Sequence, residues 1–266
     1  MNIDLKDLTE KVCMLAKETG EFIRRERVNF NRSLAVKKHE HDYVSYVDKE
    51  SEKRIVTCLR KLLPEAGFIA EEGTGSLTDE AYCWLVDPLD GTTNFIHNIA
   101  PYCVSIALRH RNDLVLGVVY EICRDECFYT YKGAPSYLNG QEIQVSEVDN
   151  LDDSFLAIGL PYDSEHYKPI ATFLVNECYG NVTGLRTVGA AAAELCYVAA
   201  GRLDGRIEGC IGPWDIAAGT LILLHAGGTI TDFSGGDNYT SGREIIGSNG
   251  KIHAKILALF QKRQKC

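Results

Sequence analysis

Two aspartates and two threonines stand together in the sequence WLVDPLDGTTNF, which begins at Trp84. The apolar residues before Asp87 predict a buried strand, and the residues from Asp90 to Thr92 favour the start of a helix. The two carboxylates could bind cations, and the free N–H groups of a first helical turn could bind an anion such as phosphate. An Asp-Pro turn followed by a capped helix would leave the same pattern, so this segment alone leaves both interpretations open.

Acidic residues also stand at the ends of two other apolar segments. Glu71 and Glu72 come directly after Phe68–Ala70, which predicts a short buried strand, and Asp215 lies in the first turn of a helix that begins at Pro213. A solvated turn would explain the first pair, and a favourable charge at a helix N-terminus would explain Asp215. Solvated faces do not usually place so many acids beside apolar sequence, so the pattern favours one shared site.

The carboxylates of Glu71, Asp87, Asp90 and Asp215 would repel one another if they converged on one cleft. Their repulsion would raise the pKa of each group unless cations neutralised them. These motifs contain no His or Cys, and a ligand set of oxygen atoms alone favours Mg²⁺, or Mn²⁺ as a substitute, over Zn²⁺. Two such ions about 4 Å apart would stabilise both the attacking and the leaving oxygen of a phosphoryl transfer.

The segments 84–97 and 214–228 resemble the two signatures of the inositol monophosphatase family of Mg²⁺-dependent, lithium-sensitive phosphatases. The second segment reads WDIAAGTLILLHAGG, and the resemblance covers nearly the whole chain. It implies an α/β fold of the layered αβαβα sandwich type, a homodimer, and hydrolysis of a phosphomonoester. In the implied reaction a metal-activated water attacks phosphorus directly, with no covalent enzyme intermediate.

The resemblance also implies roles for single residues. Two or three Mg²⁺ ions would be held by Glu71, Asp87, the Leu89 carbonyl, Asp90 and Asp215. Catalysis would involve three side chains, because Thr92 and Glu71 would orient and help to deprotonate the attacking water and Asp48 would help to hold a third metal. Lys37 would lie beside Asp48 on a mobile loop.

Substrate contacts follow from the same resemblance. The phosphate would meet the amides of Gly91 and Thr92, and the substrate alcohol would meet a stretch that follows Arg186. The full set of implied substrate-binding residues is Asp90, Gly91, Thr92, Gly189, Ala190, Ala191, Glu208 and Asp215. One departure is Ala70, where the family usually has Gly, and this change affects backbone freedom rather than a ligand.

Glu208 is the residue on which we base the choice of substrate. A carboxylate can accept hydrogen bonds from the vicinal hydroxyls of a polyol, although an exposed acid at a strand end is the alternative. The stretch 189–215 contains only Arg202 and Arg206 as basic residues, which favours one phosphate over two. We therefore expect myo-inositol monophosphate as substrate. Fructose 1,6-bisphosphate, histidinol phosphate and 3′-phosphoadenosine nucleotides remain alternatives, as does a non-enzymatic binding protein that retains the fold.

The elements that must position these residues follow from periodicity. Helices are expected at 5–23 and 49–63, with a charged loop at 37–42 between them, and strands of an antiparallel meander at 103–108, 114–120, 126–131 and 142–145. Strands and helices alternate after about residue 154. This pattern predicts a single catalytic domain, 1–266, with one lobe at about 1–150 and another at about 151–266.

Composition limits the class of protein. The chain has 266 residues, 45% of them hydrophobic, and a net charge of −9. This balance is typical of a globular protein, and the absence of a basic stripe argues against binding to nucleic acid or to an anionic membrane. The N-terminal segment does not resemble a signal peptide and the ten cysteines mostly stand among apolar residues, so we expect a cytoplasmic protein with reduced thiols.

Overall fold

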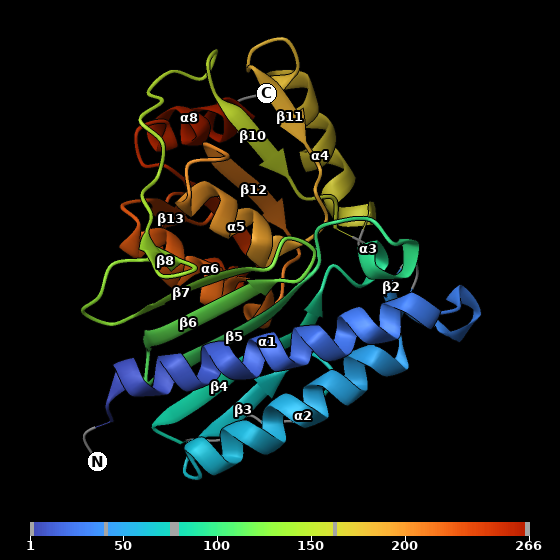
Figure 1. Cartoon of the computed structure of the whole chain (residues 1–266). Helices are drawn as coiled ribbons and strands as arrows, with labels where there is room; N and C mark the ends of the chain where they lie inside the picture. The colour runs from blue at the N-terminus through green and yellow to red at the C-terminus, as the bar shows by residue number, and fades with distance from the viewer. Residues whose placement is uncertain (1–2, 40–41, 75–79, 162–163, 264–266) are drawn as a thin grey trace.

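A helix pair covers one face of the first sheet. In the computed structural model, which describes residues 3–39, 42–74, 80–161 and 164–263, α1 (Leu5–Asn29) and α2 (Tyr46–Leu62) lie side by side (Figure 1). The side chain of Asp4 caps α1 by accepting from the amides of Lys6 and Asp7. The apolar faces of both helices pack on the sheet in one continuous core, so the predicted amphipathic helices are confirmed and α1 is one turn and a half longer than expected.

The first sheet has seven strands in the described part of the chain. Its spatial order equals its order in the sequence: β3 (Gly67–Ala70), β4 (Tyr82–Asp90), β5 (Cys103–His110), β6 (Asp113–Glu121), β7 (Glu126–Tyr131), β8 (Tyr137–Leu138) and β9 (Gln141–Glu142). Strands β3 and β4 are parallel, and every later pair is antiparallel. The antiparallel meander is therefore confirmed, and the parallel pair places the ends of β3 and β4 side by side.

The second sheet has five strands in the order β11 (Gly184–Arg186), β10 (Phe155–Ile158), β12 (Gly205–Gly209), β14 (Glu244–Ser248) and β13 (Thr229–Thr231). Helices α5 (Ala191–Ala199) and α6 (Pro213–His225) lie between the two sheets and share one core with both. Helices α4 (Ser164–Cys178) and α8 (His253–Arg263) cover the outer face (Figure 1). The five layers confirm the αβαβα sandwich.

Some local details differ from the sequence-based expectations. Of the expected charged loop 37–42, residues 37–39 belong to β1 (Val36–His39) and Asp42 begins β2 (Asp42–Val44), and these strands pair as an antiparallel hairpin; residues 40 and 41 lie outside the described part of the chain. Strand β4 continues to Asp90 instead of ending at Asp87, because pairing with β5 resumes after an irregularity between these two residues. Strands β8 and β11 were not predicted. Of the expected strand 142–145, only Glu142 lies in a strand, as the second residue of β9.

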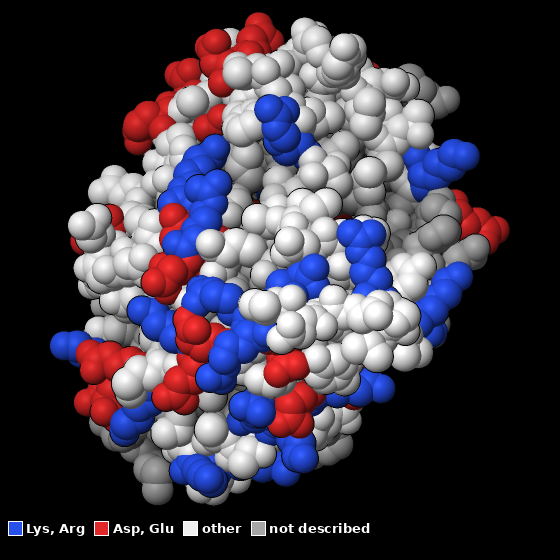
Figure 2. All heavy atoms as spheres, turned by 45° about the vertical axis from the view of Figure 1, so that its right-hand side comes forward, with Lys and Arg blue, Asp and Glu red and all other residues white. Residues whose placement is uncertain are grey.

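The remaining elements are short. They comprise a 3₁₀ helix at Arg32–Leu34, α3 (Thr92–His97) and α7 (Tyr239–Gly242). Within the described residues no helix has the length and apolar character needed to cross a membrane. On the face shown in Figure 2, basic and acidic side chains are interspersed rather than gathered into a basic stripe.

Candidate active site

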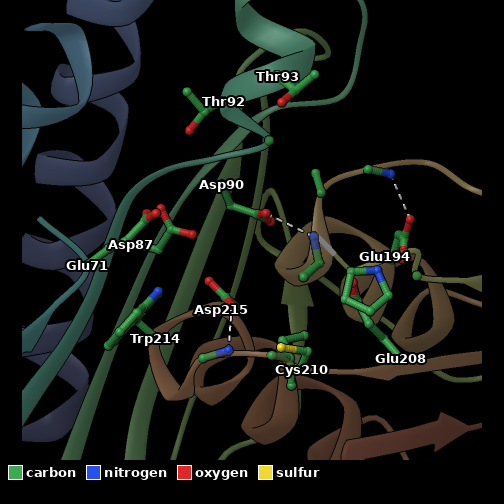
Figure 3. A pocket seen from close by; sticks show the side chains of 18 of the residues that line it. Glu71, Asp87, Asp90, Thr92, Thr93, Glu194, Glu208, Cys210, Trp214 and Asp215 are labelled. Atoms are coloured by element: carbon green, nitrogen blue, oxygen red, sulfur yellow. Dashed lines mark hydrogen bonds between the residues drawn. The ribbon is translucent and has the colours of Figure 1, made fainter. Parts of the chain in front are cut away.

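One cavity of about 660 Å³ collects almost all of the predicted site residues. The end of β4, the start of α3 and the first turns of α5 and α6 meet there, and β12 contributes Glu208 from the other side (Figure 3). Of the residues with an expected role, all except Asp48 and Lys37 line the cavity: Glu71, Asp87, Leu89, Asp90, Gly91, Thr92, Gly189, Ala190, Ala191, Glu208 and Asp215.

Asp87 and Glu71 lie together because β3 and β4 are parallel neighbours. The amide of Glu71 donates to the Val86 carbonyl at 3.1 Å, which carries the β3–β4 pairing one residue past the strand. Asp87 is 2% exposed, and its Oδ1 accepts from the amide of Leu89 at 2.9 Å. The two carboxyl groups lie next to each other at one side of the cavity (Figure 3).

Asp90 connects the first half of the chain to helix α5. Its Oδ1 accepts from the amide of Ala191 at 2.9 Å and its Oδ2 from the amide of Ala192 at 2.7 Å. Ala190, at the N-cap position, has no side chain that could do this. Asp90 therefore satisfies the free N–H groups of a helix that begins 101 residues later.

Asp215 approaches from the opposite side of the cavity. It lies in the first turn of α6, where Pro213 fits because its missing N–H is not needed at that position. Its Oδ2 accepts from the amide of Gly212 at 2.7 Å. The carboxylate is fixed by its own helix terminus and faces Asp87 and Asp90 (Figure 3).

The four carboxyl groups have raised pKa values because they are buried. Burial, with Asp215 and Glu72 nearby, raises the pKa of Glu71 to about 8, and burial with Asp90 nearby raises that of Asp215 to about 7. Burial also raises the pKa of Asp87 and Asp90, and in Asp87 the charges of Glu71 and Asp90 add to it. A site that buries so many acids favours cations, as the sequence predicted.

These groups suit a hard divalent cation by their chemistry. They offer carboxylate oxygens and the Leu89 carbonyl, which is the donor set of Mg²⁺. Over the described ranges, no three acidic, His or Cys side chains are arranged to enclose an ion as they stand. The fit therefore rests on donor type and on the repulsion that a cation would relieve, not on a preformed cage.

A lysine supplies positive charge beside Glu71. The Nζ of Lys38 lies 3.1 Å from Glu71 Oε1 and also contacts Glu72. Lys37, which the family resemblance placed beside Asp48, is exposed. The hairpin explains the difference, since adjacent residues of a strand point to opposite faces and only one of the two can reach the carboxylates.

Thr92 and Asp48 form a pair at the start of α3. Thr92 Oγ1 donates to Asp48 Oδ1 at 2.8 Å and lies 3.1 Å from the Leu89 carbonyl. Asp48 is buried, and its Oδ2 accepts from the amide and hydroxyl of Ser45 in a capping box at the start of α2. Asp48 thus lies behind Thr92 and outside the cavity lining, where it can orient the hydroxyl.

Arg206 and Glu194 also line the cavity, and neither was given a role there from the sequence. Arg206 Nε donates to Glu194 Oε2 at 2.7 Å, and Nη2 donates to Glu208 Oε2. Glu194 Oε1 accepts from the amides of Val188 and Gly189 at 2.9 and 3.0 Å. The sequence could have indicated that Glu194 has a partner. It is the one charged residue in the otherwise apolar helix α5, and burying an acid without a partner would be costly.

Comparison with known proteins gives the same family over nearly all of the chain. The model of the inositol monophosphatase family matches residues 4–265. Nus factor SuhB of Escherichia coli K12 is 37% identical over 245 residues, which are 91% of each chain. The crystal structure of the extragenic suppressor protein suhB from Bartonella henselae superposes with a TM-score of 0.91 at 34% identity and covers 96% of this chain and 99% of that one. Inositol monophosphatase from Anabaena (Nostoc) sp. PCC 7120 superposes with a TM-score of 0.86 at 29% identity, covering 98% and 97%. The chain belongs to the inositol monophosphatase family.

Proposed function

We propose that the protein is a Mg²⁺-dependent phosphomonoesterase that hydrolyses a small polyol phosphate, with myo-inositol monophosphate as its substrate. The observation that carries this proposal is the layout of the cavity. The acids Glu71, Asp87, Asp90 and Asp215 gather at one side, and Glu208 stands apart from them on β12. One side suits cations and a phosphate, and the other suits hydroxyl groups.

The bound Mg²⁺ would neutralise the four carboxylates, withdraw charge from the phosphate and lower the pKa of the attacking water. The chain's own groups then orient the reactants. Because the Thr92 hydroxyl donates its hydrogen bond to Asp48, the lone pairs of its oxygen remain available to accept a hydrogen bond from that water. Glu71 is the neighbouring carboxylate that can take the water's proton.

The test is phosphate release from a panel of esters, measured with Mg²⁺ and with EDTA. The panel contains inositol 1-phosphate, fructose 1,6-bisphosphate, histidinol phosphate and 3′-phosphoadenosine 5′-phosphate. The proposal expects Mg²⁺-dependent release that is fastest from the inositol ester.

A non-enzymatic binding role is the second candidate, and the observation that favours it is the name Nus factor carried by the E. coli relative. Absence of release from every ester would favour that candidate.

Removing the Thr92 hydroxyl is expected to slow the reaction without releasing the metal. Thr92→Ala should lower kcat by about 10²-fold, the scale of a lost proton-handling group, with little change in Mg²⁺ affinity. Thr92→Ser retains the hydroxyl and is the matched control, so it should keep most of the activity. Titration of Mg²⁺ against steady-state rate measures both quantities, and a large loss of Mg²⁺ affinity in Thr92→Ala would reassign Thr92 to metal binding.

Removing the Glu208 carboxylate is expected to weaken the choice between substrates. A carboxylate that accepts hydrogen bonds from hydroxyls discriminates against esters that lack them, so Glu208→Ala should reduce the preference for inositol 1-phosphate by about 10–200-fold in kcat/KM. The comparison uses fructose 1,6-bisphosphate and 3′-phosphoadenosine 5′-phosphate. A parent enzyme that prefers either of these, or a variant with unaltered preference, would contradict the assignment.

A further inference from the structure

Arg206 is a fully buried arginine whose three nitrogens have different surroundings. It is 1% exposed, and it projects from the same face of β12 as Glu208, two residues later. Nε and Nη2 each donate to a carboxylate, of Glu194 and Glu208 respectively. Nη1 is buried and has no hydrogen-bond partner. One guanidinium group therefore joins two acids that line the same cavity.

Glu208 is held from a second side by the backbone of Gly159. The amide of Gly159 donates to the Ile207 carbonyl at 2.8 Å, which places it beside β12. A Cβ atom on Gly159 would lie 2.0 Å from Glu208 Cδ and 2.3 Å from Oε1. The Glu208 carboxylate therefore lies directly against the chain at Gly159 while Arg206 holds its Oε2. Arg206 donates to Oε2 and makes no hydrogen bond to Oε1 of Glu208.

The other acid connects Arg206 to the metal side of the cavity. Glu194 Oε1 accepts from the amides of Val188 and Gly189. The amides of Ala191 and Ala192, at the start of α5, donate to Asp90. Gly189 has a φ of 85°, which a residue other than glycine adopts with strain. Arg206 is thus the link between the turn that holds Asp90 and the carboxylate that faces the substrate alcohol.

Stability alone does not explain this arrangement. Burying three ionised groups has a desolvation cost that their attraction often fails to exceed, and a buried guanidinium nitrogen without a partner adds to that cost. Arg202 has a different environment. It is partly exposed and makes a bidentate ion pair with Glu126 alone, with N–O distances of 2.6 and 2.7 Å.

We propose that Arg206 is a positioning residue that sets substrate selectivity. By holding Oε2 of Glu208 while the carboxylate packs against Gly159, Arg206 keeps Oε1 in one fixed orientation to accept a hydrogen bond from a substrate hydroxyl. This inference rests on the proposed phosphatase function. It predicts that an enzyme with a flexible or displaced Glu208 discriminates less between a polyol phosphate and a phosphate ester that has no neighbouring hydroxyls. This loss occurs even though the carboxylate is still present.

The test compares inositol 1-phosphate with p-nitrophenyl phosphate in the parent and in variants. Arg206→Lys keeps the charge but cannot hold both acids with a planar fork. It should lower the ratio of kcat/KM values for the two esters by about 10-fold, mainly through a higher KM for the inositol ester. Arg202→Lys is the matched control, because it weakens an arginine–glutamate pair outside the cavity, and its ratio should equal that of the parent.

A second variant reaches Glu208 without changing Arg206. Gly159→Ala pushes the carboxylate from its place and should lower the ratio by a similar factor. A purely structural role of Arg206 would reduce the amount of folded enzyme and slow both esters equally, so the ratio would stay constant. An unchanged ratio in Gly159→Ala, or in folded Arg206→Lys, would overturn the inference. A parent that releases phosphate from neither ester in Mg²⁺ would instead overturn the proposed function, and the inference with it.

Discussion

Replacement of Asp90 by Asn is expected to lower kcat by at least about 10³-fold, the scale of losing a principal electrostatic contact in a water-excluded site. The change removes one negative charge where cations and phosphate would meet. It also affects the turn at α5, because Asp90 accepts from two amides there. An Asn side chain has one oxygen, so its NH₂ group would face an N–H donor.

The matched control for this prediction is Asp204→Asn. Asp204 is also a buried aspartate, and its Oδ2 accepts from the amide of Phe155 at 2.6 Å, but it does not line the cavity. We expect Asp204→Asn to lower the thermal midpoint and to leave kcat of the folded protein near the parent value. Steady-state rates at saturating Mg²⁺ and substrate, with thermal unfolding of each variant, separate the two effects. An unchanged kcat in Asp90→Asn would remove Asp90 from the reaction.

Removal of Mg²⁺ is expected to abolish phosphate release and to destabilise the fold. The free protein buries four acids, at Glu71, Asp87, Asp90 and Asp215, that repel one another when ionised at neutral pH. A cation that binds only the folded chain stabilises it by about 2.7 kcal/mol at 100 times its Kd. The thermal midpoint should therefore rise with Mg²⁺ concentration, independently of any turnover.

The control for chelation is EDTA already saturated with Mg²⁺, which should leave the rate unchanged. Li⁺ should lower the rate by competing for one metal position, as the family resemblance implies. Full activity in EDTA, or a thermal midpoint that does not respond to Mg²⁺, would contradict the proposed metal site.

The parts of the site that lie in contiguous motifs could be predicted from the sequence. Asp87 and Asp90 stand three residues apart after one apolar run, and the short strand before Glu71 is the preceding strand in the sequence, so the two strands could be neighbours in one sheet. These signals depend on local pattern, and local pattern also identified most helices and strands. The parallel pairing of β3 with β4 then brought the acids together.

The remaining parts depend on contacts between distant segments. Arg206 and Glu194 are separated in sequence by 12 residues and belong to a strand and a helix, so no local pattern indicates their pairing. The choice between Lys37 and Lys38 depends on which face of a hairpin meets Glu71, and the sequence was interpreted as a loop there. The extension of β4 to Asp90 depends on its pairing with β5 beyond the irregularity.

The contact between Asp90 and the start of α5 has a consequence for how the chain folds. Without Asp90, the first amides of α5 have no side-chain cap, so that helix terminus is completed only when a loop of 101 residues has closed. Contacts of such long sequence separation slow folding and tie distant segments into one cooperative transition. We therefore expect a fragment that begins near residue 151 to form α5 poorly on its own, and the two halves of the chain to unfold together in a single step.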